Sequence, residues 1–500
     1  MRVEYPPSIF RSWFYRAILF FAMIVLSAPA IAETLRGNLR DDLPNIDPTA
    51  FNGPIANRLL ALVYEGLTSI SENGQIAPAL AERWETPDGG RTWRFYLRRG
   101  ARFHSGRALS AGDVRHSFET LLKAKRPAIG QQFLDALRGR AEYLRGEALH
   151  VAGIKIVDPL TIEFRFDEPV AAFPYYPYFI FDSHAEAAGG PGWHTTRSAG
   201  TGPFKLKSWR RGRDLTLAVN SDYWGPIPAA DEARFIITPS IESALAMFDA
   251  GALDFVVAAE PAHQLIAADP RRRAGLQTAE RMQARVLAMN AVVYPPFADQ
   301  RVRAAISLTL DRNAVISGIF GGLATKPDGF GASRLLRLDG ASPVDAPLSQ
   351  DYDPAAAREL LAQAGFPGGV GLPPIDLVAI DFSLNEGAFY ANALVRELGM
   401  SVTLKTMERT AMISAALAGR LGLFIGGWTA DFPDPLTYLE PVWRSGSPYN
   451  QSRWSDPVFD ALVDSARHVA DAAARAPLYL QAERRLRETT AAAMLPTPHN

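Results

Sequence analysis

The sequence of 500 residues predicts a mixed fold of helices and strands, either α/β or α+β. Two observations predict it: segments in which apolar and polar residues alternate, and segments with helical spacing that begin at capping residues. Apolar residues make up 48% of the chain and charged residues 21%, which is ordinary for a soluble globular protein. The length allows several domains.

The N-terminus resembles a secretory signal peptide. Arg11 and Arg16 precede the apolar run 17–26, and small residues follow up to Ala32. A basic region, a short apolar region and an A-x-A site predict cleavage after Ala32, so that residues 1–32 are removed. The alternative, a membrane anchor, requires about 20 apolar residues, and this run is shorter.

Cysteine is absent from the chain. Its absence excludes a thiol nucleophile, a thiolate metal site and a lipid-modified N-terminal cysteine. Together with the signal peptide, it predicts a periplasmic protein without a lipid anchor.

Two strands follow from alternation of period two. In residues 92–98, Trp93, Phe95 and Leu97 fall on one face, and charged or phenolic residues fall on the other. Residues 162–166 alternate in the same way. The pair Asp158-Pro159 before them predicts a turn between two strands.

Helix starts are marked by capping residues. Ser110 and Asp113 form a capping-box pattern ahead of an apolar stripe. Asp353 and Asp456 each precede a proline that opens a helical pattern. Gly365 stands where a left-handed C-terminal cap is expected.

The charge balance gives no sign of a nucleic-acid partner. The net charge is −1, and the longest basic run that we considered, 271–273, is typical of a solvated surface. We therefore expect neither nucleic acid nor an anionic membrane surface as a partner.

Enzyme signatures are missing from the sequence. The eight histidines lack metal-ligand spacing, and there is no G-x-S-x-G elbow, P-loop or G-x-G-x-x-G loop. We therefore expect no catalytic residues, no metal and no cofactor, and we predict that the protein is not an enzyme.

One acidic segment is a candidate site. An apolar run at 423–425 leads into the loop 426–435, where Asp434-Pro435 is explained as a turn. Asp431 lies near Trp428, and a carboxylate beside a large aromatic side chain is a good receptor for an ammonium group. Asp431 and Asp434 together could also form a general acid/base pair. Because no nucleophile or metal site accompanies them, binding is the favoured interpretation.

The chain after residue 32 resembles the bacterial extracytoplasmic solute-binding proteins of family 5, which includes the dipeptide-, oligopeptide- and nickel-binding proteins of ATP-driven importers. The resemblance rests on short segments that occur in the family's order along nearly the whole chain. These segments are 43–48, 63–67, 76–84, 103–114, 200–204, 220–224, 299–305, 310–312, 352–354, 364–366 and 427–435.

The resemblance implies a two-lobed periplasmic-binding-protein fold, type II-like, with an additional inserted subdomain. Lobe one is expected from 33–70, 185–282 and 485–500, the inserted subdomain from 71–184, and lobe two from 283–484. In this family a hinge closes the lobes over the ligand, and the closed complex docks on a membrane permease whose ATPase drives release.

The resemblance also implies a function and a site. We expect a monomeric receptor of an ABC importer that captures short peptides, with Asp431 binding the α-ammonium and Gly427, Trp428 and Thr429 lining the same wall. A metal chelate, an opine or a sugar derivative is an alternative ligand. A sensory role and a periplasmic hydrolase are further alternatives.

Two features depart from the family pattern. Relatives continue for some tens of residues beyond the segment that matches 493–498, and we expect the shorter end here to leave an edge uncovered. The group that would bind a peptide's carboxylate is not evident, and Arg334, Arg337 and Arg409 are candidates from their place in lobe two.

The Gly200-Thr-Gly202 turn is expected either near the cleft or simply as a tight turn.

Overall fold

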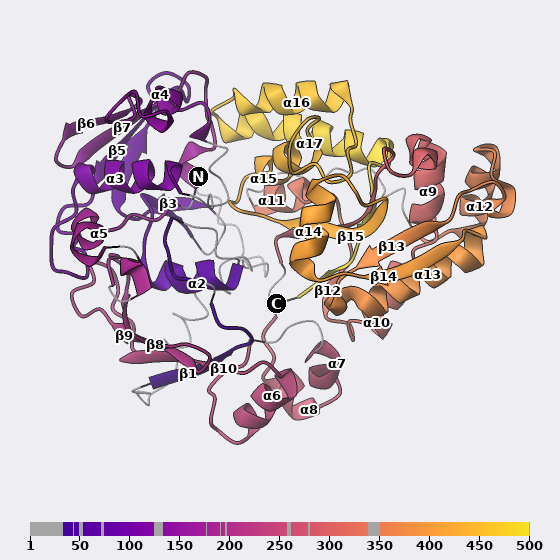
Figure 1. The fold of residues 1–500 in the computed structure, drawn as a ribbon, viewed down its shortest axis with the longest axis horizontal. Coiled ribbons are helices and arrows are strands. Elements are labelled where there is room, and N and C mark those ends of the chain that lie inside the picture. The colour runs from indigo at the N-terminus through magenta and orange to yellow at the C-terminus, as the bar shows by residue number, and fades with distance from the viewer. Residues whose placement is uncertain are drawn as a thin grey trace, which may run out of the picture.

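The computed structural model describes residues 34–499, apart from 44, 50–53, 72–74, 125–133, 177, 191, 196–197, 258–261, 279–280 and 339–350. The expected signal peptide lies outside the described residues. Within them, no helix is long and apolar enough to cross a membrane. Helices and sheets form two masses, and each is built around sheets of its own (Figure 1).

The first mass contains a four-stranded sheet of order β1-β10-β9-β8, in which only β1 and β10 are parallel. These strands come from the two N-terminal ranges that we assigned to lobe one. The strands are β1 (Thr34–Leu39), β8 (Phe204–Arg210), β9 (Asp214–Val219) and β10 (Glu232–Ile237). The helices are α2 (Pro54–Val63), α5 (Ser183–Gly189), α6 (Ile241–Asp249), α7 (Ala262–Ala267) and α8 (Pro270–Ala274).

A second antiparallel sheet, of order β4-β5-β7-β6, lies above the first one in Figure 1 and is covered by α3. Apart from β2, which lies at the end of the range 33–70, the elements named here come from the range that we assigned to the inserted subdomain. They are β4 (Ala81–Glu85), β5 (Thr92–Leu97), α3 (Ala111–Leu122), α4 (Arg140–Leu144), β6 (Ile154–Asp158) and β7 (Thr161–Arg165), with a separate hairpin of β2 (Thr68–Ile70) and β3 (Ile76–Pro78).

The alternation predicted for residues 92–98 is confirmed in β5. Trp93, Phe95 and Leu97 are buried, while the residues between them are half-buried. In β7 the alternation is lost, because Glu163 on the second face is buried as well. On the same face of the sheet, Arg94 of β5 forms an ion pair with Glu163 of β7 at 2.8 Å.

The second mass contains a five-stranded mixed sheet of order β14-β13-β15-β11-β16. Strands β13, β14 and β15 run parallel, and β11 is antiparallel to β15 and β16. The strands are β11 (Gln283–Met289), β13 (Ile375–Ala379), β14 (Val402–Thr406), β15 (Leu423–Thr429) and β16 (Ala493–Leu495), with β12 (Ala324–Thr325) and β17 (Thr497–Pro498) paired beside them. The helices are α9 (Gln300–Leu308), α10 (Arg312–Gly318), α11 (Ala332–Leu338), α12 (Pro354–Gln363), α13 (Leu384–Leu398), α14 (Arg409–Leu417), α15 (Leu436–Tyr438), α16 (Pro457–Arg467) and α17 (Ala472–Glu488).

The C-terminal segment differs from its expected assignment to lobe one. Residues 493–495 form the edge strand of the five-stranded sheet by pairing with β11, and β17 pairs with β12. The three side chains of β16 are all buried. An apolar strand is stabilised where both of its faces are covered, and the edge of β11 supplies its backbone partners. The other lobe boundaries stay predictions.

The predicted helix caps agree with the structure. The backbone N–H of Ser110 donates to the Asp113 carboxylate at 3.0 Å, which is one half of the capping box. Asp353 and Asp456 are the N-caps of α12 and α16. Gly365 has a φ of +94° just after α12, as the predicted C-terminal cap requires.

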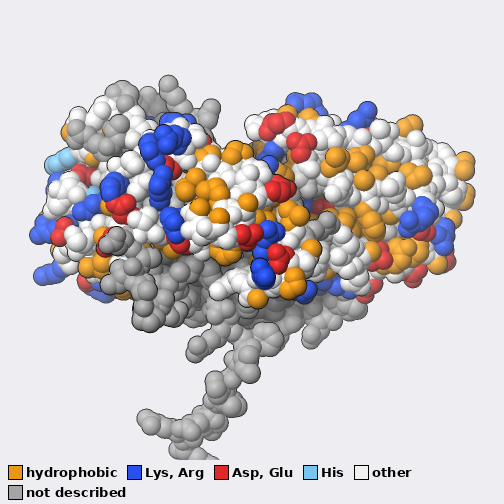
Figure 2. Space-filling view, turned by 90° about the horizontal axis from the view of Figure 1, so that it is seen from below, with side chains coloured by type: hydrophobic (Ala, Val, Ile, Leu, Met, Phe, Trp, Pro, Cys, Tyr) orange, Lys and Arg blue, Asp and Glu red, His pale blue; other side chains and the backbone are white. Residues whose placement is uncertain are grey.

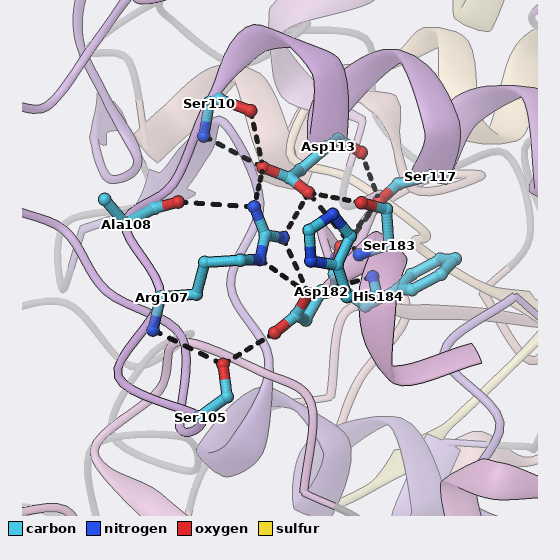
Figure 3. A network of polar contacts seen from close by, with 10 residues as sticks. Ser105, Arg107, Ala108, Ser110, Asp113, Ser117, Asp182, Ser183 and His184 are labelled. Atoms are coloured by element: carbon cyan, nitrogen blue, oxygen red, sulfur yellow. Dashed lines mark hydrogen bonds and ion pairs between the residues drawn. The ribbon is translucent and has the colours of Figure 1, made fainter. Parts of the chain in front are cut away.

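A network of polar side chains joins the inserted subdomain to the chain segment that returns to lobe one (Figure 3). Arg107 donates to Asp182 at 2.6 Å and to Asp113 at 3.0 Å. Serine hydroxyls complete it, because Ser183 donates to Asp113 at 2.7 Å and Ser105 donates to Asp182 at 2.6 Å. The network lowers the pKa of both carboxyl groups through hydrogen bonds and the Arg107 charge, against the effect of burial.

The two masses touch through side chains of the inserted subdomain and lobe two. The Tyr176 and Phe432 rings pack edge-to-face with centroids 4.9 Å apart. Arg467 at the end of α16 pairs with Glu168 at 3.0 Å and with Glu440 at 3.3 Å. Seen from below, positive and negative side chains are interspersed over both masses, with a notch between them (Figure 2).

Candidate functional site

The candidate loop begins where β15 leaves the five-stranded sheet. Gly427 is paired with Arg285 of β11, and a Cβ at Gly427 would lie 2.6 Å from the carbonyl oxygen of Ala284. Only glycine therefore permits the close approach of β11 at this point. Gly427 and Thr429 are exposed, and Trp428 is half-buried.

Asp431 is held two residues beyond the strand. Its carboxylate accepts a hydrogen bond from Trp428 Nε1 at 3.2 Å, and its backbone N–H donates to Thr437 Oγ1 at 2.9 Å. Among the described residues no ion pair is made by Asp431. The structure thus brings Asp431 and Trp428 into direct contact, as the sequence interpretation required.

The pKa of Asp431 is raised to about 7, chiefly because burial disfavours the charged carboxylate. The hydrogen bonds from Trp428 and Thr437 act in the opposite direction and do not compensate. Asp431 is half-buried and makes no ion pair among the described residues, and such a carboxylate can gain a partner from a ligand that carries a positive charge.

Aromatic side chains from both masses surround this carboxylate. The charge of Asp431 raises the pKa of Tyr178, Tyr438 and Tyr449 after the larger effect of burial. Tyr449 packs edge-to-face on Trp428 at 5.5 Å. Trp428 and Tyr449 thus provide aromatic surface beside Asp431, and aromatic faces favour cationic groups.

Asp434 has a different role from Asp431. It is buried, pairs with Arg475 at 2.6 Å and accepts a hydrogen bond from Tyr479 at 2.8 Å. Its carboxylate also accepts from the backbone N–H of Leu436 at 2.9 Å, as in the predicted turn. Since its charge is neutralised by Arg475, Asp434 is poorly placed to share a proton with Asp431 in an acid/base pair.

The candidate carboxylate anchors are spread over lobe two. Arg334 on α11 is buried. Its guanidinium donates hydrogen bonds to the carbonyl oxygen of Arg281 at 2.9 Å and to the Asp328 carboxylate at 3.3 Å. Arg409 begins α14 and is exposed. Arg337 also lies on α11, but its side chain is outside the described residues.

The Gly200-Thr-Gly202 turn lies against the end of α2. A Cβ at Gly200 would lie 1.8 Å from the carbonyl oxygen of Val63, so the turn needs glycine for close packing. Thr201 donates to Glu65 at 2.8 Å. This geometry favours the interpretation as a tight turn within lobe one.

Glu65 is a residue that the sequence interpretation missed. It accepts hydrogen bonds from Thr201, from Tyr223 at 2.8 Å and from Trp224 Nε1 at 2.9 Å. Burial raises its pKa, and these three donors oppose the rise. One carboxylate thus joins three of the segments that carry the family resemblance, 63–67, 200–204 and 220–224. Only the order of these segments in the sequence indicated that they belong together, and it did not single out Glu65.

A polar pocket of about 430 Å³ lies between the two masses. Asp135 and Glu168 line it from the inserted subdomain, and Glu440 and Arg467 line it from lobe two. The negative charge of Asp135 raises the pKa of Tyr178 and Tyr449, as the charge of Asp431 does. The pocket thus neighbours the Asp431 site.

No group of three or more His, Asp or Glu residues in the described part of the chain could hold a metal ion.

Comparison with known families identifies the chain. Residues 75–450 match the model of the bacterial extracellular solute-binding proteins, family 5. The chain belongs to this family. Members of family 5 are solute-binding proteins, and the family assignment made from the short sequence segments is confirmed.

Relatives of similar length occur in two other bacteria. A probable deoxycholate-binding periplasmic protein of Escherichia coli is 28% identical, over 94% of this chain and 91% of the relative. A probable di/tripeptide-binding protein of Pseudomonas aeruginosa is also 28% identical, over 96% of this chain and 93% of the relative.

Solved structures confirm the two-lobed fold. The murein tripeptide binding protein MppA of Escherichia coli superposes with a TM-score of 0.76, at 23% identity, over 94% of each chain. The family 5 member described here therefore has the periplasmic-binding-protein architecture that the resemblance implied.

Proposed function

We propose that this family 5 protein is the periplasmic receptor of an ABC importer and that it captures short peptides between its two lobes. The observation that carries the proposal is Asp431, a half-buried carboxylate that has no cationic partner among the described residues. The α-ammonium of a peptide supplies such a partner, and Trp428 and Tyr449 provide aromatic surface beside it.

Peptides fit this site better than a bile acid does. One relative is named for deoxycholate and another for di- and tripeptides. Deoxycholate carries a carboxylate and no cationic group, so it would place a second negative charge near Asp431 or leave Asp431 unpaired. An ammonium ligand avoids both costs.

A hydrolase is a weaker candidate. Of the two aspartates that such an enzyme would use, Asp434 is neutralised by Arg475 at 2.6 Å. The other aspartate, Asp431, makes no ion pair among the described residues and is suited to binding a cation.

The proposed partners follow from the transport role. Closure of the lobes over the peptide creates the surface that a membrane permease and its ATPase recognise.

The bound ligand itself provides the test. The protein is purified from its host without denaturation, and native mass spectrometry compares its mass before and after the ligand is released by mild denaturation. A set of short peptides supports the proposal and gives the preferred length. A single bile acid, chelate or sugar derivative would retain the transport role and exclude peptides as the substrate.

A further inference from the structure

A small apolar pocket of about 20 Å³ lies next to the Asp431 loop in lobe two. Trp428 is the wall that the pocket and the carboxylate share, because it lines the pocket and donates its indole N–H to Asp431 at 3.2 Å. Tyr449 lines the pocket as well and packs edge-to-face on Trp428, with ring centroids 5.5 Å apart. Both side chains are half-buried. A ligand group bound to Asp431 therefore has this pocket as its neighbour.

Small residues of the β11–β15 pair form the floor of the pocket. Ala284 of β11 is paired with Trp428 of β15, and paired residues lie on the same face of a sheet. Two residues further along each strand, and so again on this face, Val286 is paired with Gly426. A Cβ at Gly426 would lie 3.6 Å from Oε1 of Gln451, which lines the pocket too. The space exists because these floor positions carry small side chains or none.

The chemistry of the walls selects apolar groups. None of the described residues that line the pocket is charged. Tyr438 and Trp443 cover it from α15 and the helical turn that follows, and both are buried. The hydroxyl of Ser452, another lining residue, donates to the side-chain oxygen of Asn450 at 3.1 Å. A charged group would lose its hydration here without gaining an ionic partner, whereas an aliphatic group gains contact with apolar walls.

The volume of the pocket limits the size of the group that enters it. A space of about 20 Å³ holds a group of the size of one water molecule or one methyl group. A branched side chain would have to displace the walls. Val286 and Trp443 among these walls are buried in the core of the molecule, where close packing opposes such a displacement.

We propose that this pocket receives the side chain of the first residue of a bound peptide and selects a methyl-sized apolar group there. The inference rests on the proposed function and adds the class of ligand: short peptides that begin with alanine. The first side chain is the one that reaches the pocket, because a single carbon atom separates its Cβ from the ammonium nitrogen that Asp431 binds. Trp428 contacts that carboxylate and lines the pocket, so one side chain positions both groups of the ligand.

Isothermal titration calorimetry with three probes tests the inference. The probes are trialanine, valyl-alanyl-alanine and alanyl-valyl-alanine, titrated into the mature chain. The wild-type protein should bind trialanine about 10-fold more tightly than valyl-alanyl-alanine, because the two added methyl groups overfill the pocket. Alanyl-valyl-alanine should not show this loss, since its first side chain is still a methyl group.

A variant that enlarges the pocket provides the decisive comparison. Val286→Ala removes from the floor the two methyl groups that the valyl probe adds, so it should shift the ratio of the two affinities by about 10-fold in favour of valyl-alanyl-alanine. A ratio measured within one variant does not depend on how much of the protein is folded. Val378→Ala is the matched control. Val378 is buried in β13 of the same sheet and does not line the pocket, so this variant should keep the wild-type ratio.

The remaining outcomes distinguish this inference from the function on which it rests. Equal wild-type affinities for trialanine and valyl-alanyl-alanine overturn the pocket assignment and leave peptide capture in place. The same holds for a ratio that Val286→Ala and Val378→Ala change equally, or for a change that Val286→Ala causes only with alanyl-valyl-alanine. Failure of the wild-type protein to bind any of the three probes counts against peptide capture and against the pocket assignment with it.

Discussion

At the scale of single residues, two aspartates three positions apart have opposite environments. Asp434 pairs with Arg475 and accepts a hydrogen bond from Tyr479, whereas Asp431 makes no ion pair among the described residues and its pKa is raised to about 7 by burial. A carboxylate that is costly to ionise in the empty protein is well prepared to receive a cation. Asp431 is therefore the residue at which the proposed function is most directly tested.

Asp431→Asn should weaken peptide binding by roughly 2–5 kcal/mol, because it leaves a desolvated ammonium without its counter-charge. Titration calorimetry with trialanine measures the change. Asp376→Asn, at an exposed position of β13, is the matched control and should leave the affinity unchanged. Equal affinities of wild-type and Asp431→Asn would remove Asp431 from the site.

Affinity should also depend on pH through Asp431. The free protein binds a proton with a pKa of about 7, whereas the ammonium complex needs the carboxylate ionised. Peptide affinity should therefore fall as the pH drops below about 7, by about tenfold per pH unit. Asp431→Asn should lose this dependence, and a wild-type affinity that is flat between pH 5 and 7 would contradict the assignment.

The same group affects stability with a definite sign. The folded-state pKa of Asp431 lies above the ordinary value of 3.8, so its stabilising contribution is present at low pH and is lost as the pH rises through about 7. Ligand-free Asp431→Asn is accordingly expected to be more stable than the wild type at pH 8.

At the scale of elements, the Arg107 network decides how the inserted subdomain is attached. One guanidinium, whose side chain is 27% exposed, joins Asp113 at the start of α3 to Asp182 just before α5. The carboxylates are 1% and 3% exposed. The predicted capping box at Ser110 and Asp113 is therefore also part of a contact between subdomain and lobe.

Arg107→Ala should destabilise the protein by about 3–5 kcal/mol, because two buried carboxylates would face each other without a cation. Urea unfolding followed by fluorescence measures the loss. Arg138→Ala is the control: its partner Asp167 is exposed, and removal of an exposed pair costs about 0–1 kcal/mol. A similar small loss for both variants would show that the network contributes little.

Acid should act on the same network. The pKa values of Asp113 and Asp182 are lowered in the folded protein, so their stabilising contribution is present above the ordinary carboxyl range and is lost as the pH falls below it. In Arg107→Ala this acid-dependent loss is expected to be smaller.

At the scale of the whole molecule, buried apolar side chains of the inserted subdomain and of the second mass belong to one core cluster, with an ion pair beside it. Arg467 pairs with Glu168 across the gap, and Tyr176 meets Phe432 beside it. An ion pair that is partly exposed contributes little by itself. Under the proposed function, a ligand that contacts both lobes stabilises the closed form over the open one.

Binding should therefore compact the molecule. Small-angle X-ray scattering with and without saturating trialanine should show a smaller radius of gyration for the complex. Identical curves with and without bound peptide would exclude hinge closure.

The sequence by itself determined the local elements and the family. Alternation predicted β5, and the caps at Ser110, Asp353 and Asp456 predicted three helices, because such signals depend on residues close in the chain. The contact between Asp431 and Trp428 was also predicted, whereas the role of Asp431 as an ammonium receptor stays a prediction. Asp431 and Trp428 are three residues apart, so their contact is local.

Only the tertiary structure decided what lies far apart in sequence. The pairing of residues 493–495 with β11 and the convergence of three segments on Glu65 each join positions separated by more than a hundred residues. No local pattern encodes such distances. Burial decided the rest: Asp431 and Asp434 look alike in the sequence, and only the surrounding side chains give one an arginine partner and leave the other for the ligand.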